Sequence, residues 1–473
     1  MAKPLAEPLR VGLAGLGTVG SAVAAMLARS QATLMERTGR RIELAAYASK
    51  DPPKDATLDL SKARKVDSPV ALARESGIDV FVELMGGEGD PAKSSIEAAL
   101  ELGRSVVTAN KALLARHGAA LARLAEAHDA ALFFEAAVAG GIPIVKTLRE
   151  GLGGSRIQRV YGILNGTCNY ILTRMQKEHL SFAECLKEAQ RLGYAEADPT
   201  FDIGGFDTAH KIAILSSLAF GTEVDAEAVH VEGIESITLA DLEGAEELGY
   251  RVKLLGVAQR TEAGIEQRVH PTMVPQGSVI AEVDGVINAV AVDADTMELT
   301  LMGPGAGGAA TASAVVADLM DLACGRRVAS FGRPAAALAK AQRAPMQRHE
   351  GGYYIRLAAL DRPGTAATIA RRMAEEKISL ESIMQRGRDR RPHGGEDPLR
   401  VDKPALVVLI TYATTEDAVR RALATIEADG VLAEKPQLIR IEKRLRRNAC
   451  PCEGEGGHRF SDKDMRNSKR SRA

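Results

Sequence analysis

The chain has 473 residues, 45% of them hydrophobic, and 61 Lys and Arg residues stand against 62 Asp and Glu residues. This composition excludes a disordered chain, and the lack of a basic excess argues against a protein that binds nucleic acid through its overall charge. The length predicts two or three domains, and since no uninterrupted apolar run reaches about 18 residues, we expect no membrane span.

Apolar runs alternate with helical segments through the first 135 residues. The expected strands are Leu9–Ala14, Ile42–Ala48, Val80–Leu84, Ser105–Thr108 and Ala131–Glu135, and the expected helices are Ser21–Ala28, Pro91–Leu102 and His117–His128. Such alternation is typical of a parallel sheet with helices on both faces. We therefore predict an α/β fold for this region.

A glycine-rich loop, Gly15-Leu16-Gly17-Thr18-Val19-Gly20, joins the first strand to the first helix. The first glycine permits a tight turn, the second lets a pyrophosphate approach the backbone, and the third lets helix and strand pack closely. Thr18, Val19 and Gly20 would offer the N–H groups of the helix start to a phosphate. A tight strand–helix turn without a ligand is the alternative. The loop predicts a Rossmann-type NAD(P)-binding domain over residues 1–135.

The end of the second strand bears on the choice of cofactor. An NAD enzyme often carries an acid there for the ribose hydroxyls, but here Ser49 and Lys50 come first and the acid follows only at Asp51. Ser49 and Lys50 would suit a 2′-phosphate, which favours NADP over NAD. The alternative is that Lys50 is an ordinary surface lysine.

The pattern changes after about residue 140, which predicts a second domain of α+β type over residues 136–304. The expected strands are Ile157–Asn165, Tyr250–Gln259, Glu266–Pro271 and Val283–Val292, and the expected helices are Asn169–Glu178, Phe182–Leu192 and Thr208–Phe220. A second glycine-rich turn, Gly303–Gly308, precedes the helix Ala309–Leu322. We expect this late helix, within residues 305–325, to pack back on the first domain.

The C-terminal third reads as a linker, a small module and a tail. Residues 333–350 form the predicted linker, and residues 351–443 show the element order βαββαβ interrupted by a charged loop at 387–403. Residues 444–473 are basic and predict a disordered tail, with contact to nucleic acid as the alternative. Cys450 and Cys452 lie in this tail without evident metal partners.

The remaining cysteines bear on the cell compartment. Cys168, Cys185 and Cys324 are isolated from one another in the sequence, so they suggest no disulfide framework. They predict reduced thiols and a cytoplasmic protein.

Two segments carry residues suited to catalysis. Asp207 and Lys211 are four residues apart at a helix start and share a face, and Glu196 lies in the turn before them. Lys111 follows a strand of the first sheet at the edge where ligands sit in open α/β folds. Taken singly, each could be a helix-end or surface charge worth little. Together with the dinucleotide loop they predict a substrate site.

These segments resemble homoserine dehydrogenase. The run from Ala189 through Gly193, Asp198-Pro199, Asp202-Ile203, Gly205 and Asp207 to Lys211 is similar to the signature of that family. Val80–Gly87, Val106–Leu113 and Asn165-Gly166-Thr167 also look like family segments, and the resemblance covers residues 9 to 325. No aspartate-kinase segment precedes the dinucleotide loop, so the resemblance is to the monofunctional form. It implies NAD(P)-dependent interconversion of L-homoserine and L-aspartate 4-semialdehyde in threonine, methionine and isoleucine biosynthesis.

The resemblance also implies roles for single residues. Lys211 would be the catalytic acid and base, with Lys111 close to the same substrate oxygen, and two neighbouring cations would lower the pKa of one lysine. Glu196 and Asp207 would bind the substrate. The cofactor-binding residues would be Gly15, Gly17, Thr18, Val19, Gly20, Lys50, Gly87, Lys111, Gly193, Gly305 and Gly307.

A metal ion and an effector follow from the same resemblance. Glu135 and the carbonyl groups of Val138, Gly140 and Ile142 would hold a monovalent cation, Na+ or K+, for which such oxygen ligands are suited. The C-terminal module is similar to the ACT domain, with Asp361–Gly364 as its first turn, and would bind L-threonine as a feedback inhibitor. A homodimer or homotetramer is expected, with residues 136–304 as the substrate and dimerisation domain. A dimerisation module without a ligand is the alternative.

Two other functions compete with this interpretation: another NAD(P)-dependent enzyme of similar build, such as an amino-acid or semialdehyde dehydrogenase, and a non-catalytic sensor. A semialdehyde dehydrogenase would need a nucleophilic cysteine, and Cys168 follows Gly166-Thr167, but no histidine constellation accompanies it. A non-catalytic amino-acid sensor would use only the C-terminal module. The retention of Lys111, Glu196, Asp207 and Lys211 argues against the sensor.

Overall fold

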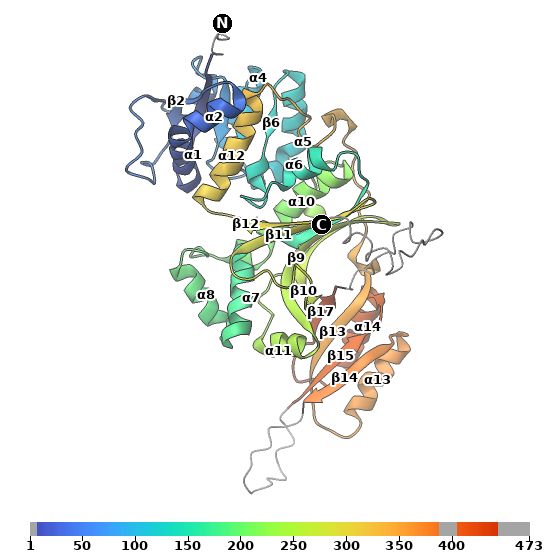
Figure 1. Ribbon diagram of the computed structural model, residues 1–473. Coiled ribbons are helices and arrows are strands. Elements are labelled where there is room, and N and C mark those ends of the chain that lie inside the picture. The colour runs from blue at the N-terminus through green and yellow to red at the C-terminus, as the bar shows by residue number, and fades with distance from the viewer. Residues whose placement is uncertain (1–6, 387–403, 443–473) are drawn as a thin grey trace, which may run out of the picture.

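The computed structural model describes residues 7–386 and 404–442. The predicted tail, with Cys450 and Cys452, and the charged loop at 387–403 lie outside the described residues. In Figure 1 a first domain lies at one end of the molecule, the second domain in the middle and the C-terminal module at the other end. No helix of the described part combines the length and hydropathy that a membrane crossing requires.

The first domain contains a six-stranded parallel sheet in the order β3-β2-β1-β4-β5-β6. Its strands are β1 Leu9–Ala14, β2 Ile42–Ala48, β3 Arg64–Lys65, β4 Val80–Glu83, β5 Ser105–Thr108 and β6 Leu132–Phe133. Its helices are α1 Thr18–Arg29, α2 Gln31–Thr38, α3 Pro69–Arg74, α4 Ala92–Glu101 and α5 Lys111–Ala127. The strand order reverses between β1 and β4, which places a ligand crevice at the carboxyl ends of these two strands. The predicted α/β class is confirmed.

A helix from much later in the chain completes this domain. Helix α12, Gly308–Ala323, packs against α1. Its Val315 and Leu319 are fully buried in one apolar cluster with Val11 and Leu13 of β1. Because α12 closes the first domain from residues beyond 300, the turn before it is brought next to the dinucleotide loop.

A second, mixed sheet of eleven strands runs through the rest of the molecule in the order β12-β11-β7-β9-β10-β17-β13-β15-β14, with β8 and β16 attached at its side. Its strands are β7 Ile157–Ile163, β8 His230–Val231, β9 Tyr250–Thr261, β10 Gly264–Pro275, β11 Ile287–Ala294, β12 Glu298–Pro304, β13 Glu350–Ala359, β14 Leu380–Arg386, β15 Ala405–Thr411, β16 Thr414–Thr415 and β17 Gln437–Ile441. Strands β10 and β17 pair in parallel, with Thr272 opposite Arg440. The C-terminal module therefore continues the sheet of the second domain.

Helices cover this sheet on either side of that junction. They are α6 Ile144–Lys146, α7 Gly166–Glu178, α8 Phe182–Arg191, α9 Thr200–Ile203, α10 Phe206–Phe220 and α11 Leu239–Glu247 in the second domain, and α13 Thr365–Glu375 and α14 Glu416–Ala428 in the module. Gly256 of β9 lets α10 approach the sheet, since a Cβ there would lie 2.9 Å from Thr208 Cγ2. In the module α13 and α14 pack on one face of its strands, and the element order is the predicted βαββαβ with the two-residue strand β16 added before α14.

Several boundaries differ from the sequence prediction. Helix α7 begins at Gly166 rather than Asn169, because the Asn165 side chain accepts a hydrogen bond from the Cys168 N–H and caps the helix. Strand β6 ends at Phe133, and Glu135 starts a 3-10 turn. Residues 333–350 lie along the second domain, where Arg343 forms two hydrogen bonds to Asp225. The sequence prediction missed β12, α2, α3 and α11, which are short or exposed over much of their surface. It also missed the elements of two to four residues, β3, β8, β16, α6 and α9.

Candidate functional site

Each glycine of the first loop is needed for a different structural reason. Gly15 has a φ of 97° and a Cβ there would lie 2.8 Å from the Leu84 carbonyl oxygen, while a Cβ on Gly20 would overlap the Gly15 carbonyl. Gly17 is different, because no atom lies within 4 Å of the position its Cβ would take. The open space beside Gly17, at the start of α1, suits the close approach of a pyrophosphate to the backbone.

A buried carboxylate shapes the neighbouring loop. Glu83, at the end of β4, accepts hydrogen bonds from the N–H groups of Met85 (2.7 Å) and Gly86 (3.1 Å) and from the Thr108 hydroxyl (2.7 Å). Burial raises the pKa of Glu83, although these hydrogen bonds oppose the rise. The predicted site residue Gly87 lies at the end of this loop with a φ of 85°. Sequence reasoning missed Glu83, whose only signal was its place at the end of a buried strand.

Asn110 connects this loop to the first of the two lysines. Its side-chain amide donates to the Gly87 carbonyl at 2.7 Å, and its oxygen caps α5 through the Leu113 N–H at 3.0 Å. Lys111 is the first residue of α5. The first domain thus presents Lys111 at the carboxyl edge of its sheet.

The two lysines meet at one carboxylate. Asp207 lies in the first turn of α10. Its Oδ2 is 2.7 Å from Lys211 Nζ, and its Oδ1 is 3.0 Å from Lys111 Nζ. Lys211 Nζ also donates to the Leu164 carbonyl at 2.7 Å. The Asp207 side chain is 5% exposed and that of Lys111 35%, so the cluster opens to solvent on the Lys111 side. The structure therefore brings together three of the predicted catalytic and substrate-binding residues from two domains.

The charges around Asp207 differ from the expectation for two adjacent cations. Burial favours a higher pKa for Asp207, but Lys211 and Lys111 outweigh it and hold that pKa well below its ordinary value. The Asp207 charge in turn raises the pKa of Lys111, against a smaller opposing effect of burial. The pKa of Lys111 is therefore raised rather than lowered, because a carboxylate lies between the two ammonium groups.

Asn165 and Asp202 belong to the same cluster, although neither was predicted as a site residue. The Asn165 amide nitrogen donates to Asp207 Oδ2 at 2.9 Å and to Asp202 Oδ1 at 2.8 Å. Burial, and next the charge of Asp207, raise the pKa of Asp202. Both residues occur in the sequence segments that carry the family resemblance, but their side chains meet only through the fold.

The turn before α9 holds Gly193 and Glu196 at the surface. Gly193 has a φ of 75°, and the Thr167 hydroxyl fixes the turn by donating to the Tyr194 carbonyl at 2.7 Å. Glu196 is exposed, and its charge contributes to the raised pKa of Lys111. Glu196 therefore lies on the open side of the lysine pair.

The second glycine-rich turn reaches the start of α1. A Cβ on Gly308 would lie 3.0 Å from the Thr18 carbonyl oxygen, while Gly307 has a φ of 105° and open space around it. Gly305 leaves room for the Asn288 side chain, which a Cβ there would overlap. Lys50 is exposed two residues after β2. The contact between Gly308 and Thr18 places this turn next to the start of α1.

Comparisons with known proteins agree with this arrangement. The family model described as homoserine dehydrogenase matches residues 143–320, and the one described as its NAD binding domain matches residues 15–135. A homoserine dehydrogenase of Neisseria gonorrhoeae is 44% identical over 444 residues, covering 92% of this chain and 99% of that one. The chain belongs to the homoserine dehydrogenase family. It is an NAD(P)-dependent oxidoreductase that acts on a CH–OH group.

Solved structures of homoserine dehydrogenases have the same fold. The crystal structure of the Thiobacillus denitrificans enzyme matches with a TM-score of 0.84 and 43% identity, covering 92% of this chain and 98% of that one. A hyperthermophilic archaeal homoserine dehydrogenase in complex with NADPH matches with a TM-score of 0.57 and 29% identity, covering 67% of this chain and 97% of that one.

The cation site that the family resemblance implies falls in a loop between the two domains. Glu135 is 2% exposed, and its carboxylate accepts hydrogen bonds from the N–H groups of Val145 (2.9 Å) and Lys146 (2.8 Å). Burial and the neighbouring Asp318 raise its pKa to about 7. Among the described residues no donor is found for the carbonyl groups of Val138 and Gly140, while that of Ile142 accepts the Ile144 N–H. Unpaired carbonyls beside a buried acid fit a hard cation.

Cys168 has no nucleophilic character in this family member. It is fully buried, its thiol donates to the Asp202 carbonyl at 3.2 Å, and burial raises its pKa well above the ordinary value. Because the thiolate is the reactive form, this environment contradicts a covalent semialdehyde dehydrogenase mechanism. Cys168, Cys185 and Cys324 are all free thiols.

Proposed function

We propose that the chain interconverts L-homoserine and L-aspartate 4-semialdehyde with NADP as the preferred cofactor, and so serves threonine, methionine and isoleucine biosynthesis. The observation that carries the proposal is the Asp207 carboxylate, which holds Lys111 of the first domain and Lys211 of the second within 3.0 Å. A reaction between a dinucleotide and a small amino-acid alcohol needs a proton-transfer group where these two domains meet.

Oxidation of the alcohol releases a hydride from carbon and a proton from oxygen. A bound nicotinamide cofactor would supply the hydride acceptor for this oxidation. Lys211 handles the proton on the substrate oxygen, with Lys111 close to the same oxygen. In the reverse direction a charged lysine donates its proton to the aldehyde oxygen as the hydride arrives at carbon. Asp207 keeps the nitrogen atoms of both lysines in place through each half of the cycle.

The acids of the site suit an amino-acid substrate. L-homoserine carries an ammonium group that needs an anionic partner, and Asp207 and Glu196 supply carboxylates on the buried and open sides of the lysine pair. Glu196 is free to approach the substrate because it lies on an exposed turn.

The cofactor would occupy the edge beside Gly17. Its pyrophosphate would rest on the start of α1, and the loop and turn residues around that edge would form the rest of the site. These are Gly15, Gly17, Thr18, Val19, Gly20, Gly87, Lys111, Gly193, Gly305 and Gly307. Lys50, exposed beyond β2, would pair with a 2′-phosphate, and the NADPH complex of the archaeal relative supports NADP.

A monovalent cation, Na+ or K+, would be held by Glu135 and the carbonyl groups of Val138, Gly140 and Ile142. A cation there would offset the cost of burying the Glu135 carboxylate. The loop lies between the domains that carry the two lysines, so the cation would fix their relative position.

The C-terminal module would be an ACT domain that binds L-threonine as a feedback inhibitor. Its βαββαβ element order supports this assignment. We also expect a homodimer or homotetramer and a cytoplasmic location, since the described cysteines are free thiols.

The direct test follows the absorbance of reduced nicotinamide with purified protein and L-homoserine. NAD+ and NADP+ are compared in parallel, each without and with L-threonine. Homoserine-dependent reduction that is faster with NADP+ and slowed by L-threonine is expected. Folded protein that gives no turnover with either cofactor would overturn the proposed reaction, and turnover unaffected by L-threonine would overturn the assigned effector.

A further inference from the structure

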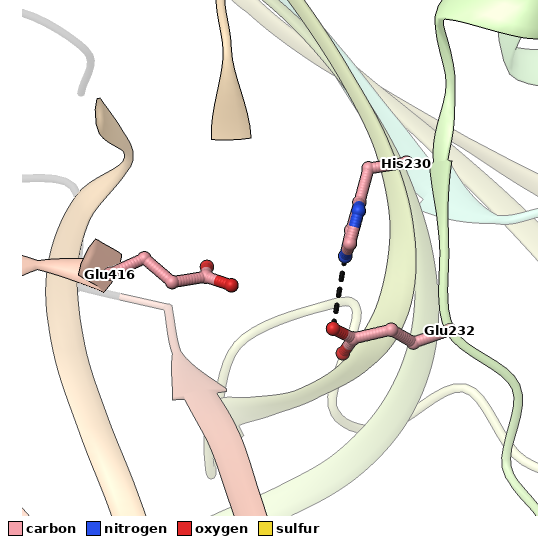
Figure 2. A group of neighbouring side chains, drawn as sticks. All are labelled: His230, Glu232 and Glu416. Carbon is pink, nitrogen blue, oxygen red and sulfur yellow. Dashed lines mark hydrogen bonds and ion pairs between the residues drawn. The ribbon is translucent and has the colours of Figure 1, made fainter. Parts of the chain in front are cut away.

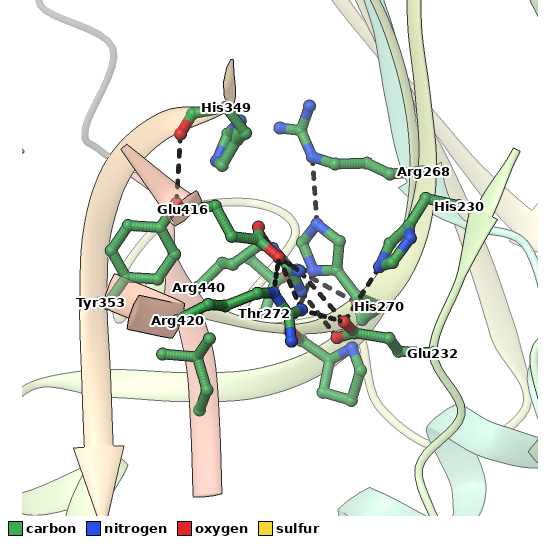
Figure 3. Close-up of polar contacts among 12 residues, drawn as sticks. His230, Glu232, Arg268, His270, Thr272, His349, Tyr353, Glu416, Arg420 and Arg440 are labelled. Carbon is green, nitrogen blue, oxygen red and sulfur yellow. Dashed lines mark hydrogen bonds and ion pairs between the residues drawn. The ribbon is translucent and has the colours of Figure 1, made fainter. Parts of the chain in front are cut away.

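A charged cluster joins the C-terminal module to the second domain (Figure 3). Arg440 of β17 is 2% exposed and donates to Glu232 at 2.7 Å and to Glu416, the first residue of α14, at 2.6 Å. Arg420, one turn further along α14, also contacts both carboxylates. Two guanidinium groups thus balance two carboxylates across the boundary between the domains.

The carboxylates of this cluster are unsuited to a metal ion. His230, Glu232 and Glu416 have ligand atoms within 4.8 Å of one another. Figure 2 shows the three side chains pointing toward one another. Arg440 and Arg420 already donate to the oxygens of both acids, so an added cation would face two guanidinium charges. Burial favours a raised pKa for Glu416, yet its hydrogen bond to Arg440 and the charge of that residue hold the pKa below its ordinary value. The cluster is therefore an ion-pair network.

The segment that carries Glu232 lies directly against the active-site loop. The Ile234 N–H donates to the Ile203 carbonyl at 2.9 Å, and a Cβ on Gly233 would overlap that same carbonyl. Gly205 has a φ of 88°, and a Cβ added there would lie 3.1 Å from Val231 Cγ1. These contacts lie within the stretch from 202 to 207, which begins with the Asn165 partner Asp202.

Gly205 is also the N-terminal cap of α10, and Asp207 follows two residues later. A shift of residues 231–234 therefore presses on the backbone that sets the position of Asp207. Because Asp207 holds both lysines, a small displacement there changes how they meet the substrate.

We propose that Glu232 is a positioning residue for the reaction: held by Arg440 and Arg420, it fixes residues 231–234 and through them the 202–207 loop. The inference rests on the proposed function for its kinetic readout. The C-terminal module is thereby connected to the active site by two contacts. One is the ion pair of Glu232 with Arg440, and the other is the backbone hydrogen bond between Ile234 and Ile203.

A second ion pair across the same boundary provides a matched control. Arg356 of β13 donates to Asp241 of α11 at 2.6 Å, and Asp241 is fully buried. Helix α11 packs mainly against β9 and α7, and its ion pair with the module is separate from the contacts of residues 202–207 with residues 231–234. Loss of this pair weakens the same domain boundary without touching the active-site loop.

The experiment compares Glu232→Gln with Asp241→Asn, both nearly isosteric, in the full chain. For Glu232→Gln we expect kcat/KM for L-homoserine to fall about five- to twenty-fold with the KM for NADP+ unchanged. For Asp241→Asn we expect a lower Tm with unchanged kinetic constants at a temperature where it is folded. Equal kinetics in the two variants would overturn the inference.

Two further measurements keep the test decisive. If Glu232→Gln does not fold, Arg420→Gln replaces it, with Arg421→Gln as its control. Both arginines are half-exposed on α14. Arg421 pairs with Glu376 and Asp417 instead of Glu232, so its loss leaves the link intact. Arg420→Gln should lower kcat/KM and Arg421→Gln should not; equal values would contradict the link. Hydrogen exchange at residues 202–207 should accelerate in the Glu232 or Arg420 variant and stay unchanged in its control. This readout needs no turnover, so it separates failure of the inference from failure of the proposed reaction.

Discussion

Asp207 governs the electrostatics of the site at the scale of single residues. The spacing of Asp207 and Lys211 predicts that they share a helix face, and the structure confirms it with a 2.7 Å ion pair. The contact to Lys111 could not be predicted from spacing, since it joins two domains. The role of Asn165 in the site could not be predicted for the same reason. An asparagine before a helix indicates a helix cap, and only the fold brings its amide to the carboxylates of Asp202 and Asp207.

The pH dependence of the two directions should differ. The Asp207 charge raises the pKa of Lys111, so this lysine stays charged and leaves Lys211 as the base of the proposed mechanism. A lysine must lose its proton before it can accept one from an alcohol, so oxidation of L-homoserine should accelerate from about pH 7 to about pH 10. Reduction of the semialdehyde needs the charged form and should not accelerate over that range. Initial rates in both directions across this range provide the check, and a flat oxidation profile would speak against lysine as the base.

Replacement of Cys168 should leave catalysis nearly intact. The thiol is buried and its pKa is raised, so it takes no part in the chemistry. Cys168→Ala should keep kcat for L-homoserine within about threefold of the wild type, with some loss of stability from the cavity. A loss of kcat beyond about a hundredfold in folded protein would restore a covalent mechanism.

At the scale of elements, the sequence predicts best where strands are short, apolar and buried. Strands β1, β2 and β5 have the predicted bounds, because residues such as Val11 and Val107 are buried in a parallel sheet. The missed β12 alternates between exposed and half-buried positions at the edge of the second sheet, so its pattern lacks an apolar face. The glycine content of residues 303–308 predicts a turn, but the contact of this turn with α1 depends on tertiary packing.

Two glycines of the dinucleotide loop should respond differently to alanine. Gly17→Ala fills the open space and should weaken NADPH binding while Tm changes little. Gly20→Ala forces the start of α1 away from the Gly15 carbonyl and should lower Tm as well as binding. Fluorescence titration with NADPH and thermal unfolding of both variants provide the check. An equal loss of Tm in the two variants would contradict the assignment of Gly17 to ligand approach.

At the scale of the whole molecule, one sheet connects the catalytic part to the C-terminal module. Sequence patterns identify the module's strands but do not reveal that β17 pairs with β10, since a two-residue parallel contact has no sequence signature. The ion pairs across this boundary join residues that are far apart in the chain. The prediction of a linker at 333–350 therefore did not indicate how extensively the second domain and the C-terminal module contact each other.

This continuity predicts cooperative unfolding of the second domain and the module. Arg356→Met leaves the buried carboxylate of Asp241 without its partner, which should lower the free energy of unfolding by about 3–5 kcal/mol. Denaturant titration followed by circular dichroism and by hydrogen exchange should show both regions losing stability together. Loss of protection in the module alone would show that the two parts unfold independently.

The most direct measurement of the central claim is L-homoserine oxidation by Lys211→Met, with NADPH binding as the control for an intact first domain. Removing the acid and base should lower kcat/KM about 10²- to 10⁴-fold while NADPH affinity stays at the wild-type value. A variant that binds NADPH normally and oxidises L-homoserine within about threefold of the wild-type rate would contradict the role of Lys211 in proton transfer.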